Sequence, residues 1–188
     1  MDDLREALKR GDRGVFRVLA DQYGERLYNA GLALSGNPSE AQDLVQESFT
    51  DALRMLSRFE GRSAPYTWLY GILRRRFLLS CRKRARFLRI LPLIGRETPE
   101  AKSDDAGEAF CAPDTLMAAV LKLPPKYREV LFLRYMEIQS VAEIAALTAV
   151  PEGTVKSRLH HAHRRLRAIL GSEAGRAELR VAEKADEL

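Results

Sequence analysis

The sequence predicts an all-α fold with two small helical domains joined by a flexible linker, the second domain carrying a helix-turn-helix. Apolar residues recur every three to four positions across residues 1–90 and 115–170. No stretch alternates with the two-residue period of a strand. An acidic segment of low apolar content separates the two helical stretches. We therefore divide the chain into domains at 1–95 and 115–170, a linker at 96–114 and a tail at 171–188.

The composition fits a protein of the cytoplasm. Hydrophobic residues make up 46% and charged residues 30% of the 188 residues, and the net charge of +5 is compatible with a nucleic-acid partner. Cys81 and Cys111 are isolated, so we expect no disulfide framework. No apolar run has the length of a signal peptide or approaches the roughly 18 residues of a membrane span, so we expect no membrane insertion.

The first domain begins with two amphipathic helices. Residues 15–34 predict one helix, which the sequence Gly36-Asn37-Pro38 breaks. We expect Ser39 to be the N-cap of the next helix, with Gln42 three residues on completing a capping box, and that helix to run to about residue 59. The side of this helix opposite its apolar positions carries Asp43, Gln46, Glu47 and Asp51.

A basic, aromatic segment follows. Residues 60–65 are typical of a loop, and a third helix is expected from residue 66 into the mid-80s. Residues 62–96 contain ten Lys or Arg and no Asp or Glu, with Tyr66, Trp68 and Tyr70 among them. Such a track suits an unstacked single strand, because arginines hold phosphates while rings stack on bases. The alternative is that Trp68 and Tyr70 are core residues of a small bundle.

The second domain carries the helix-turn-helix. We expect helices at 115–123 and 127–136, then a short helix at 141–147, a turn at 148–151 with Pro151 entering the first turn of the next helix, and that long helix at 152–170. One side of the long helix is apolar, with Val155, Leu159, Ala162, Leu166 and Ile169. The other side carries Lys156, Ser157, His160, His161, Arg164 and Arg167. This face could enter a major groove, and the alternative is an ordinary solvated basic face.

The sequence offers no catalytic constellation, so we expect a protein that is not an enzyme. It has no Ser/His/Asp arrangement, no paired carboxylates tied to a loop, no GxGxxG and no P-loop. His160, His161 and His163 are clustered, but no cysteine or carboxylate lies nearby in sequence to complete four zinc ligands. We expect neither a metal nor another cofactor, and assign the histidines to the DNA face or its edge.

Several motifs in order resemble the extracytoplasmic-function (ECF) sigma factors of the sigma-70 family. Conserved region 2 of that family is resembled by Gly36-Asn37, by the run from Ala41 to Phe49, by the run from Phe59 to Ser63, and by Thr67-Trp68-Leu69. Region 4 is resembled by Leu123-Pro124, Arg128-Glu129-Val130-Leu131, Leu133-Arg134-Tyr135, Glu143-Ile144-Ala145 and the run from Pro151 to Leu159. The resemblance covers about residues 15–90 and 115–170, on either side of the linker.

The resemblance implies a promoter-specificity subunit of RNA polymerase and a division of labour. Docking on a coiled coil of the polymerase β′ subunit would fall to Asp43, Leu44, Gln46 and Glu47. Melting and reading of the promoter −10 element would fall to Arg62, Ser63, Tyr66, Thr67, Trp68, Arg74 and Arg75. Reading of the −35 element would fall to Thr154, Lys156, Ser157, Arg158, His160, His161 and Arg164. The implied partners are core RNA polymerase through its β′ and β subunits, promoter DNA and an anti-sigma factor.

The sequence departs from the family pattern at a few positions. Arg75 stands where many members have Asn, Leu79 where many have Asp, and Ala149 where the turn usually has Gly. Two other functions stay open: a transcriptional regulator that binds DNA without polymerase, and a sigma mimic that sequesters an anti-sigma factor. The basic first domain argues against the mimic, and the docking motif argues against the plain regulator.

Overall fold

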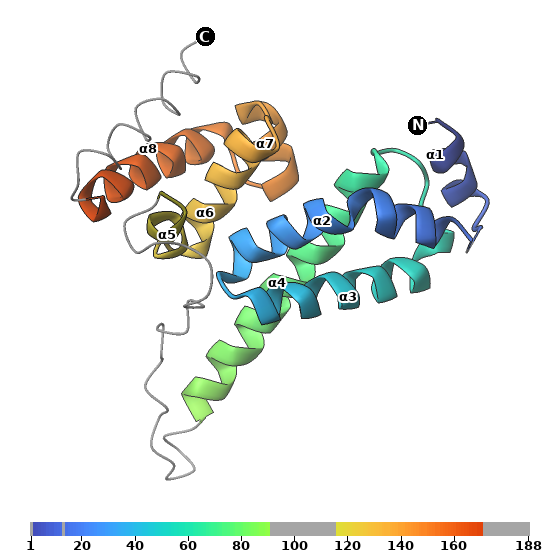
Figure 1. The fold of residues 1–188 in the computed structure, drawn as a ribbon, viewed down its shortest axis with the longest axis horizontal. Helices are drawn as coiled ribbons and strands as arrows, with labels where there is room; N and C mark the ends of the chain where they lie inside the picture. The colour runs from blue at the N-terminus through green and yellow to red at the C-terminus, as the bar shows by residue number, and fades with distance from the viewer. Residues whose placement is uncertain (1, 13, 91–115, 171–188) are drawn as a thin grey trace. The chain divides into compact units, whose positions relative to one another are not determined.

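The computed structural model describes residues 2–12, 14–90 and 116–170, and every regular element in these ranges is a helix (Figure 1). This confirms the all-α prediction. The chain forms two compact units, Met1–Asp105 and Ala106–Leu188. The predicted linker at 96–114 and the predicted tail at 171–188 lie outside the described residues. No helix in the described ranges combines the length and the apolar content needed to cross a membrane.

Unit 1 is a bundle of α1 (Asp2–Lys9), α2 (Val15–Ser35), α3 (Pro38–Arg54) and α4 (Pro65–Ile90), with a turn of 3-10 helix, η1 (Leu56–Arg58). Helices α2, α3 and α4 pack on one another in all three pairs, and α1 packs on α2 and η1. The centre of the bundle contains Leu19, Leu27, Ala30, Ala41, Ala52, Leu69 and Leu73, all fully buried. The last part of α4 extends beyond α3, and residues 81–87 there are exposed (Figure 1).

The turn between α2 and α3 is tighter than the sequence suggested. Gly36 has a left-handed backbone with φ of 74°, and its N–H donates to the carbonyl of Leu32. The N-cap of α3 is Asn37, whose side-chain oxygen accepts from the backbone N–H of Glu40 at 3.0 Å. The predicted cap at Ser39 is therefore wrong by two positions, because Pro38, which has no N–H, occupies the first helical position. Helix α3 also ends earlier than predicted, at Arg54, and η1 follows it.

Unit 2 contains α5 (Leu116–Leu121), α6 (Pro125–Leu131), α7 (Val141–Thr148) and α8 (Glu152–Ile169), and a turn of π-helix, η3 (Phe132–Met136), continues α6. Helix α8 packs on α5, α6 and α7. The side chain of Arg128 is buried, and its Nη1 donates to the carbonyls of Leu121 at 2.9 Å and Leu123 at 2.6 Å. Burial lowers the pKa of Arg128. These bonds tie α6 to the last residue of α5 and to the segment between the two helices, where carbonyls lack helical partners.

The helix-turn-helix of unit 2 is α7, a short turn and α8. Helix α7 begins with a capping box, in which Ser140 Oγ accepts from the N–H of Glu143 at 3.2 Å and Glu143 Oε2 accepts from the N–H of Ser140 at 2.8 Å. The Ser140 hydroxyl also donates to Glu143 Oε2 at 2.7 Å, and this bond, together with the one from the Ser140 N–H, stabilises the ionised carboxylate and lowers the pKa of Glu143. The turn contains Ala149, which has a left-handed backbone with φ of 52°. Pro151 is the N-cap of α8 rather than a residue of its first turn, so that expectation is wrong by one position.

Candidate nucleic-acid interface

Helix α8 presents one buried and one polar face, as predicted. Val155, Leu159, Ala162 and Leu166 are buried with exposed fractions of at most 7%. The predicted −35 residues lie elsewhere on the helix: Lys156, Ser157, His160 and Arg164 are exposed, and Thr154, Arg158 and His161 are half-buried. The fifth predicted apolar anchor is wrong, because Ile169 is exposed and Leu170 is buried in its place. Leu170 is the C-cap of α8, and its ψ of 80° lies outside the helical range.

One edge of the polar face rests on Tyr127 of α6. The ring of His161 meets the Tyr127 ring edge-on with centroids 6.4 Å apart. Two cations lie over the same ring: Arg165 at 5.4 Å and Lys126 at 5.0 Å from its centroid. Tyr127 thus holds His161 and gathers positive charge at this edge. Sequence reasoning missed both cations; the Arg165 contact joins residues more than thirty positions apart, and no motif singles out Lys126, the neighbour of Tyr127 in sequence.

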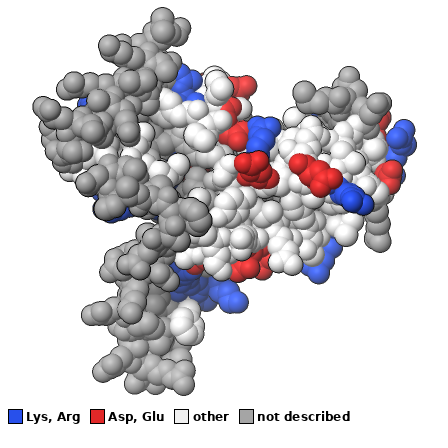
Figure 2. Space-filling model, viewed as in Figure 1, with Lys and Arg blue, Asp and Glu red and all other residues white. Residues whose placement is uncertain are grey.

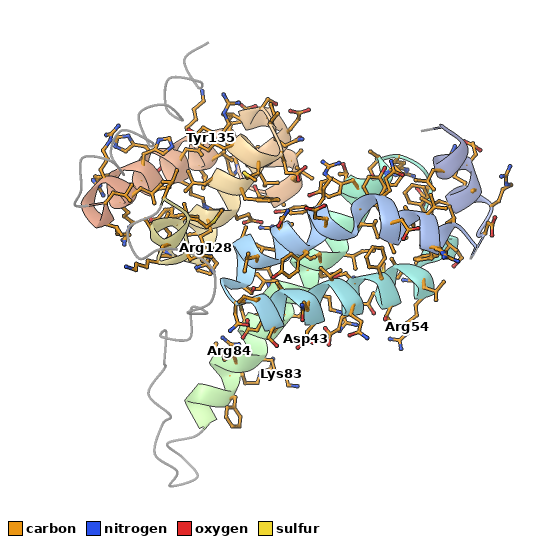
Figure 3. The ribbon with its side chains drawn as sticks, in the orientation of Figure 1. Asp43, Arg54, Lys83, Arg84, Arg128 and Tyr135 are labelled. Carbon is orange, nitrogen blue, oxygen red and sulfur yellow. The ribbon has the colours of Figure 1, made fainter. Side chains whose placement is uncertain are left out.

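The three histidines of α8 are distributed around the helix. His160 and His161 have ring centroids 5.8 Å apart, whereas the Nε2 of His163 shares a hydrogen bond of 2.9 Å with the hydroxyl of Tyr135 in η3. Tyr135 is labelled in Figure 3. No group of three or more His, Cys, Asp or Glu side chains in the described ranges is arranged to hold a metal ion. His163 therefore anchors α8 on η3, while His160 faces solvent.

The polar residues of the loop before α4 are accessible. Arg62 is 86% exposed and pairs with Glu60 at 2.6 Å within the same loop. Ser63 and Thr67 are half-buried, as is Arg74, while Arg75 is exposed. In Figure 2, positive side chains gather over the part of α4 where Figure 3 labels Lys83 and Arg84, beside acidic side chains of α3. Unit 1 thus presents a basic surface along α4 with acids at its border.

The aromatic residues of the basic segment at residues 62–96 lie in different environments. Tyr70 is buried with 1% exposure, so for Tyr70 the core alternative is correct. Trp68 is half-buried and packs on Phe59 with centroids 4.9 Å apart. Tyr66 is half-buried, and the guanidinium of Arg26 from α2 lies 3.9 Å from its ring centroid. Arg26 therefore joins this surface, although no local motif in the sequence points to it.

The acidic face of α3 is shared with arginines of α4. Asp43 and Gln46 are exposed, but Leu44 is buried with 7% exposure, so any contribution of Leu44 to docking is to hold the helix in place. Glu47 is exposed and accepts from Arg76 Nη1 at 2.9 Å. Arg76 also donates to both carboxylate oxygens of Asp51, one of them at 2.6 Å.

The ion pair between Arg76 and Asp51 changes the protonation equilibria of both residues. The hydrogen bonds from Arg76 hold the pKa of Asp51 below its ordinary value of 3.8, and those to Asp51 raise the pKa of Arg76. Arg84 pairs with Glu40 about two helical turns from the Arg76–Glu47 pair. Of the predicted docking residues, Glu47 is thus held in a fixed orientation by α4, whereas Asp43, labelled in Figure 3, is exposed on α3.

These features define a class of DNA-binding protein: a helix-turn-helix with a polar recognition helix in one unit, and a basic helical surface with aromatic residues in the other. Comparison with known proteins specifies the family. The pattern of sigma-70 region 2 matches residues 19–87, and that of sigma-70 region 4 matches residues 114–166. The ECF RNA polymerase sigma factor SigW of Bacillus subtilis is 31% identical over 87% of this chain and 92% of that protein. The ECF RNA polymerase sigma-E factor of Salmonella typhimurium is 32% identical over 85% of this chain and 88% of its own length.

The chain therefore belongs to the ECF sigma factors of the sigma-70 family, and it is a transcription initiation factor. Its fold is similar to that of the sigma factor RpoE of Bartonella quintana, solved in complex with the anti-sigma factor NepR. That likeness has a TM-score of 0.66 and 26% identity, and covers 84% of this chain and 98% of RpoE. CnrH, solved in complex with the cytosolic domain of CnrY, shares the fold with a TM-score of 0.61 and 22% identity.

Proposed function

We propose that this protein binds core RNA polymerase in the cytoplasm and directs it to promoters by recognising −35 elements and melting −10 elements. The observation that carries the proposal is the presence of sigma-70 regions 2 and 4 in one chain, in order, each within one compact unit. A protein that only bound DNA would need the helix-turn-helix of unit 2 but not the acidic docking face of α3.

In unit 2, α8 reads the −35 element as a duplex. Its buried face fixes the helix on the domain, so Lys156, Ser157 and His160 are directed outward near its start. Recognition helices enter the major groove by their N-terminal residues, which places these side chains at base edges and first phosphates. Arg164, two turns further along, is assigned to a phosphate that sets the register without reading sequence.

In unit 1, the loop and the start of α4 capture the unpaired −10 strand. Arg62 is exposed at the loop and suits a phosphate. The half-buried Trp68 and Tyr66 offer ring surface for bases at the edge of the core. Arg26, stacked on Tyr66, adds a second positive charge there.

The partners follow from the docking face and from the relatives. Asp43, Gln46 and Glu47 are assigned to the coiled coil of the polymerase β′ subunit, and the β subunit would meet the rest of the bound chain. We also propose control by an anti-sigma factor, since RpoE, with 26% identity and the same fold, was solved with one.

The test is transcription in vitro with core polymerase and a pool of DNA randomised at the −10 and −35 positions. We expect the chain to select a promoter and produce defined transcripts, while core polymerase alone does not. Replacement of both Arg62 and Ser63 by Ala should retain polymerase binding and lose permanganate-detected opening of the −10 element. Binding to DNA without any dependence on polymerase would favour the plain regulator, and binding to an anti-sigma factor without transcription would favour the mimic.

A further inference from the structure

Helix α1 lies before the sigma-70 region 2 match, which begins at residue 19, and nothing in the motifs gave it a role. It is nevertheless firmly placed. Gly11, with φ of 73°, donates to the carbonyl of Leu8 at 3.0 Å, and Asp12 donates to the carbonyl of Ala7 at 3.1 Å. These two bonds form a Schellman motif, which fixes the end of the helix. Leu8 is fully buried, and α1 packs on α2 and η1.

The last residue of α1 lies over the loop that precedes α4. Gly61 has a left-handed backbone with φ of 69° and is buried. A Cβ atom at Gly61 would overlap with Cε of Lys9 and would lie 3.2 and 3.3 Å from its Cδ and Cγ. The methylene stem of Lys9 thus covers Gly61 from Cγ to Cε. Its ammonium forms an exposed ion pair with Glu6 of the same helix at 2.8 Å.

The covered glycine directly precedes Arg62, the first of the residues assigned to the −10 strand. Phe59, two residues before it, is anchored in the core against Trp68. Arg62, directly after it, is exposed, and its ion pair with Glu60 lies within the loop and does not tie the loop to the bundle. Glycine populates both signs of φ about equally, so a Gly61 without its cover would give the loop more conformations to lose on binding.

We propose that Lys9 is a positioning residue for capture of the −10 strand: its stem braces Gly61 and so fixes where Arg62 is presented. The inference rests on the proposed function, because it assigns the loop to the −10 strand. The bracing itself is a property of the free chain. It requires the length and the apolar stem of the side chain rather than its charge.

The first experiment needs no polymerase. Hydrogen–deuterium exchange of the peptide spanning residues 59–64 is measured for the full chain and for Lys9→Ala, Lys9→Met and Arg10→Ala. Met keeps an unbranched apolar stem and removes the charge, while Arg10→Ala is the matched loss of one exposed charge beside it. We expect about fivefold faster exchange in Lys9→Ala, equivalent to about 1 kcal/mol, and rates close to the original chain in the other two.

The second experiment measures open-complex formation by holoenzyme, using permanganate on the promoter selected from the randomised pool. We expect Lys9→Ala to slow opening about fivefold, Lys9→Met to restore it, and affinity for core polymerase to stay unchanged in both. Gly61→Ala displaces the Lys9 stem, so its effect on opening should be less than additive with that of Lys9→Ala.

Different failures have different meanings. Exchange in Lys9→Ala equal to that of the original chain overturns the bracing, and so does a Lys9→Met variant as fast in exchange, or as slow in opening, as Lys9→Ala. If exchange changes as expected but the original holoenzyme opens no promoter, the proposed function fails and the role of Lys9 in strand capture fails with it. If opening is slowed only in proportion to a lower thermal stability of unit 1, Lys9 is a structural residue and the proposal is wrong.

Discussion

The ion pair between Asp51 of α3 and Arg76 of α4 should give a measurable coupling free energy between these two residues. Arg76 donates to both oxygens of Asp51 and to Glu47, and the two side chains of the main pair are 24% and 29% exposed. Arg76→Ala would leave the half-buried Asp51 carboxylate without its guanidinium. The chain also offers a matched control, the Arg84–Glu40 pair between the same helices, with side chains 66% and 41% exposed.

The size of the coupling follows from exposure. Hydrogen bonds to charged groups contribute about 1.5–3 kcal/mol where they are shielded, and exposed ion pairs contribute about 0.2–1 kcal/mol. The Asp51–Arg76 pair is bidentate but keeps some solvent, so we expect a coupling free energy of about 1–2 kcal/mol. For Glu40–Arg84 we expect about 0.5 kcal/mol or less, and a stronger loss in high salt.

The assay is a double-mutant cycle in urea, followed by tryptophan fluorescence. Trp68 is the one tryptophan of the sequence and lies in unit 1, so the signal reports the unfolding of that unit. Because the pKa of Asp51 is lowered in the folded state, its stabilisation is present above its ordinary pKa of 3.8 and is lost as the pH falls through the folded value. The coupling should therefore be constant from about pH 5 to 8 and decline progressively as the pH falls below the ordinary pKa of 3.8.

Two results would refute this reasoning. A coupling for Asp51–Arg76 no larger than that for Glu40–Arg84 would mean that the difference in exposure does not set the strength of these pairs. A coupling that persisted unchanged well below the ordinary pKa of Asp51 would mean that the ionised carboxylate is not what Arg76 stabilises.

Three further predictions concern docking, two residues of unit 2 with left-handed backbones, and the recognition helix. Glu47→Lys should weaken binding to core polymerase at least about tenfold in a titration, since it reverses a charge on the docking face and repels Arg76; unchanged affinity would rule out docking through α3. Ala149→Gly and Ile138→Gly should each stabilise unit 2 by about 0.5–2 kcal/mol, because both residues have φ of 52°, a backbone conformation that strains a side chain but not glycine. Calorimetry should show a higher unfolding midpoint for each variant, and a lower midpoint would mean that these positions are not strained. Arg164→Ala should weaken binding to all −35 duplexes alike and reduce the salt slope by about one, while Ser157→Ala should cost about 1–3 kcal/mol and relax preference at one position; the reverse pattern would exchange their roles.

The sequence by itself determined the helical class, the two sets of helices and the inward face of α8. Val155, Leu159, Ala162 and Leu166 repeat at the helical period, and all four are buried. Periodicity carries this information because a residue's direction from a helix axis depends only on its position along the chain. Caps are also local features: the capping box of α7 joins two residues three positions apart and could have been predicted from the sequence. The cap of α3 was misplaced because both Asn37 and Ser39 are residues that can cap a helix.

Only the tertiary structure decided which side chains meet across helices. Lys9 over Gly61, Arg26 over Tyr66, and Arg76 on Asp51 each join residues at least 25 positions apart. It also separated Tyr70, which is core, from the half-buried Trp68. These outcomes depend on how far one helix is shifted and rotated against another. Packing sets that geometry through contacts between distant residues, and no local pattern of residues encodes it.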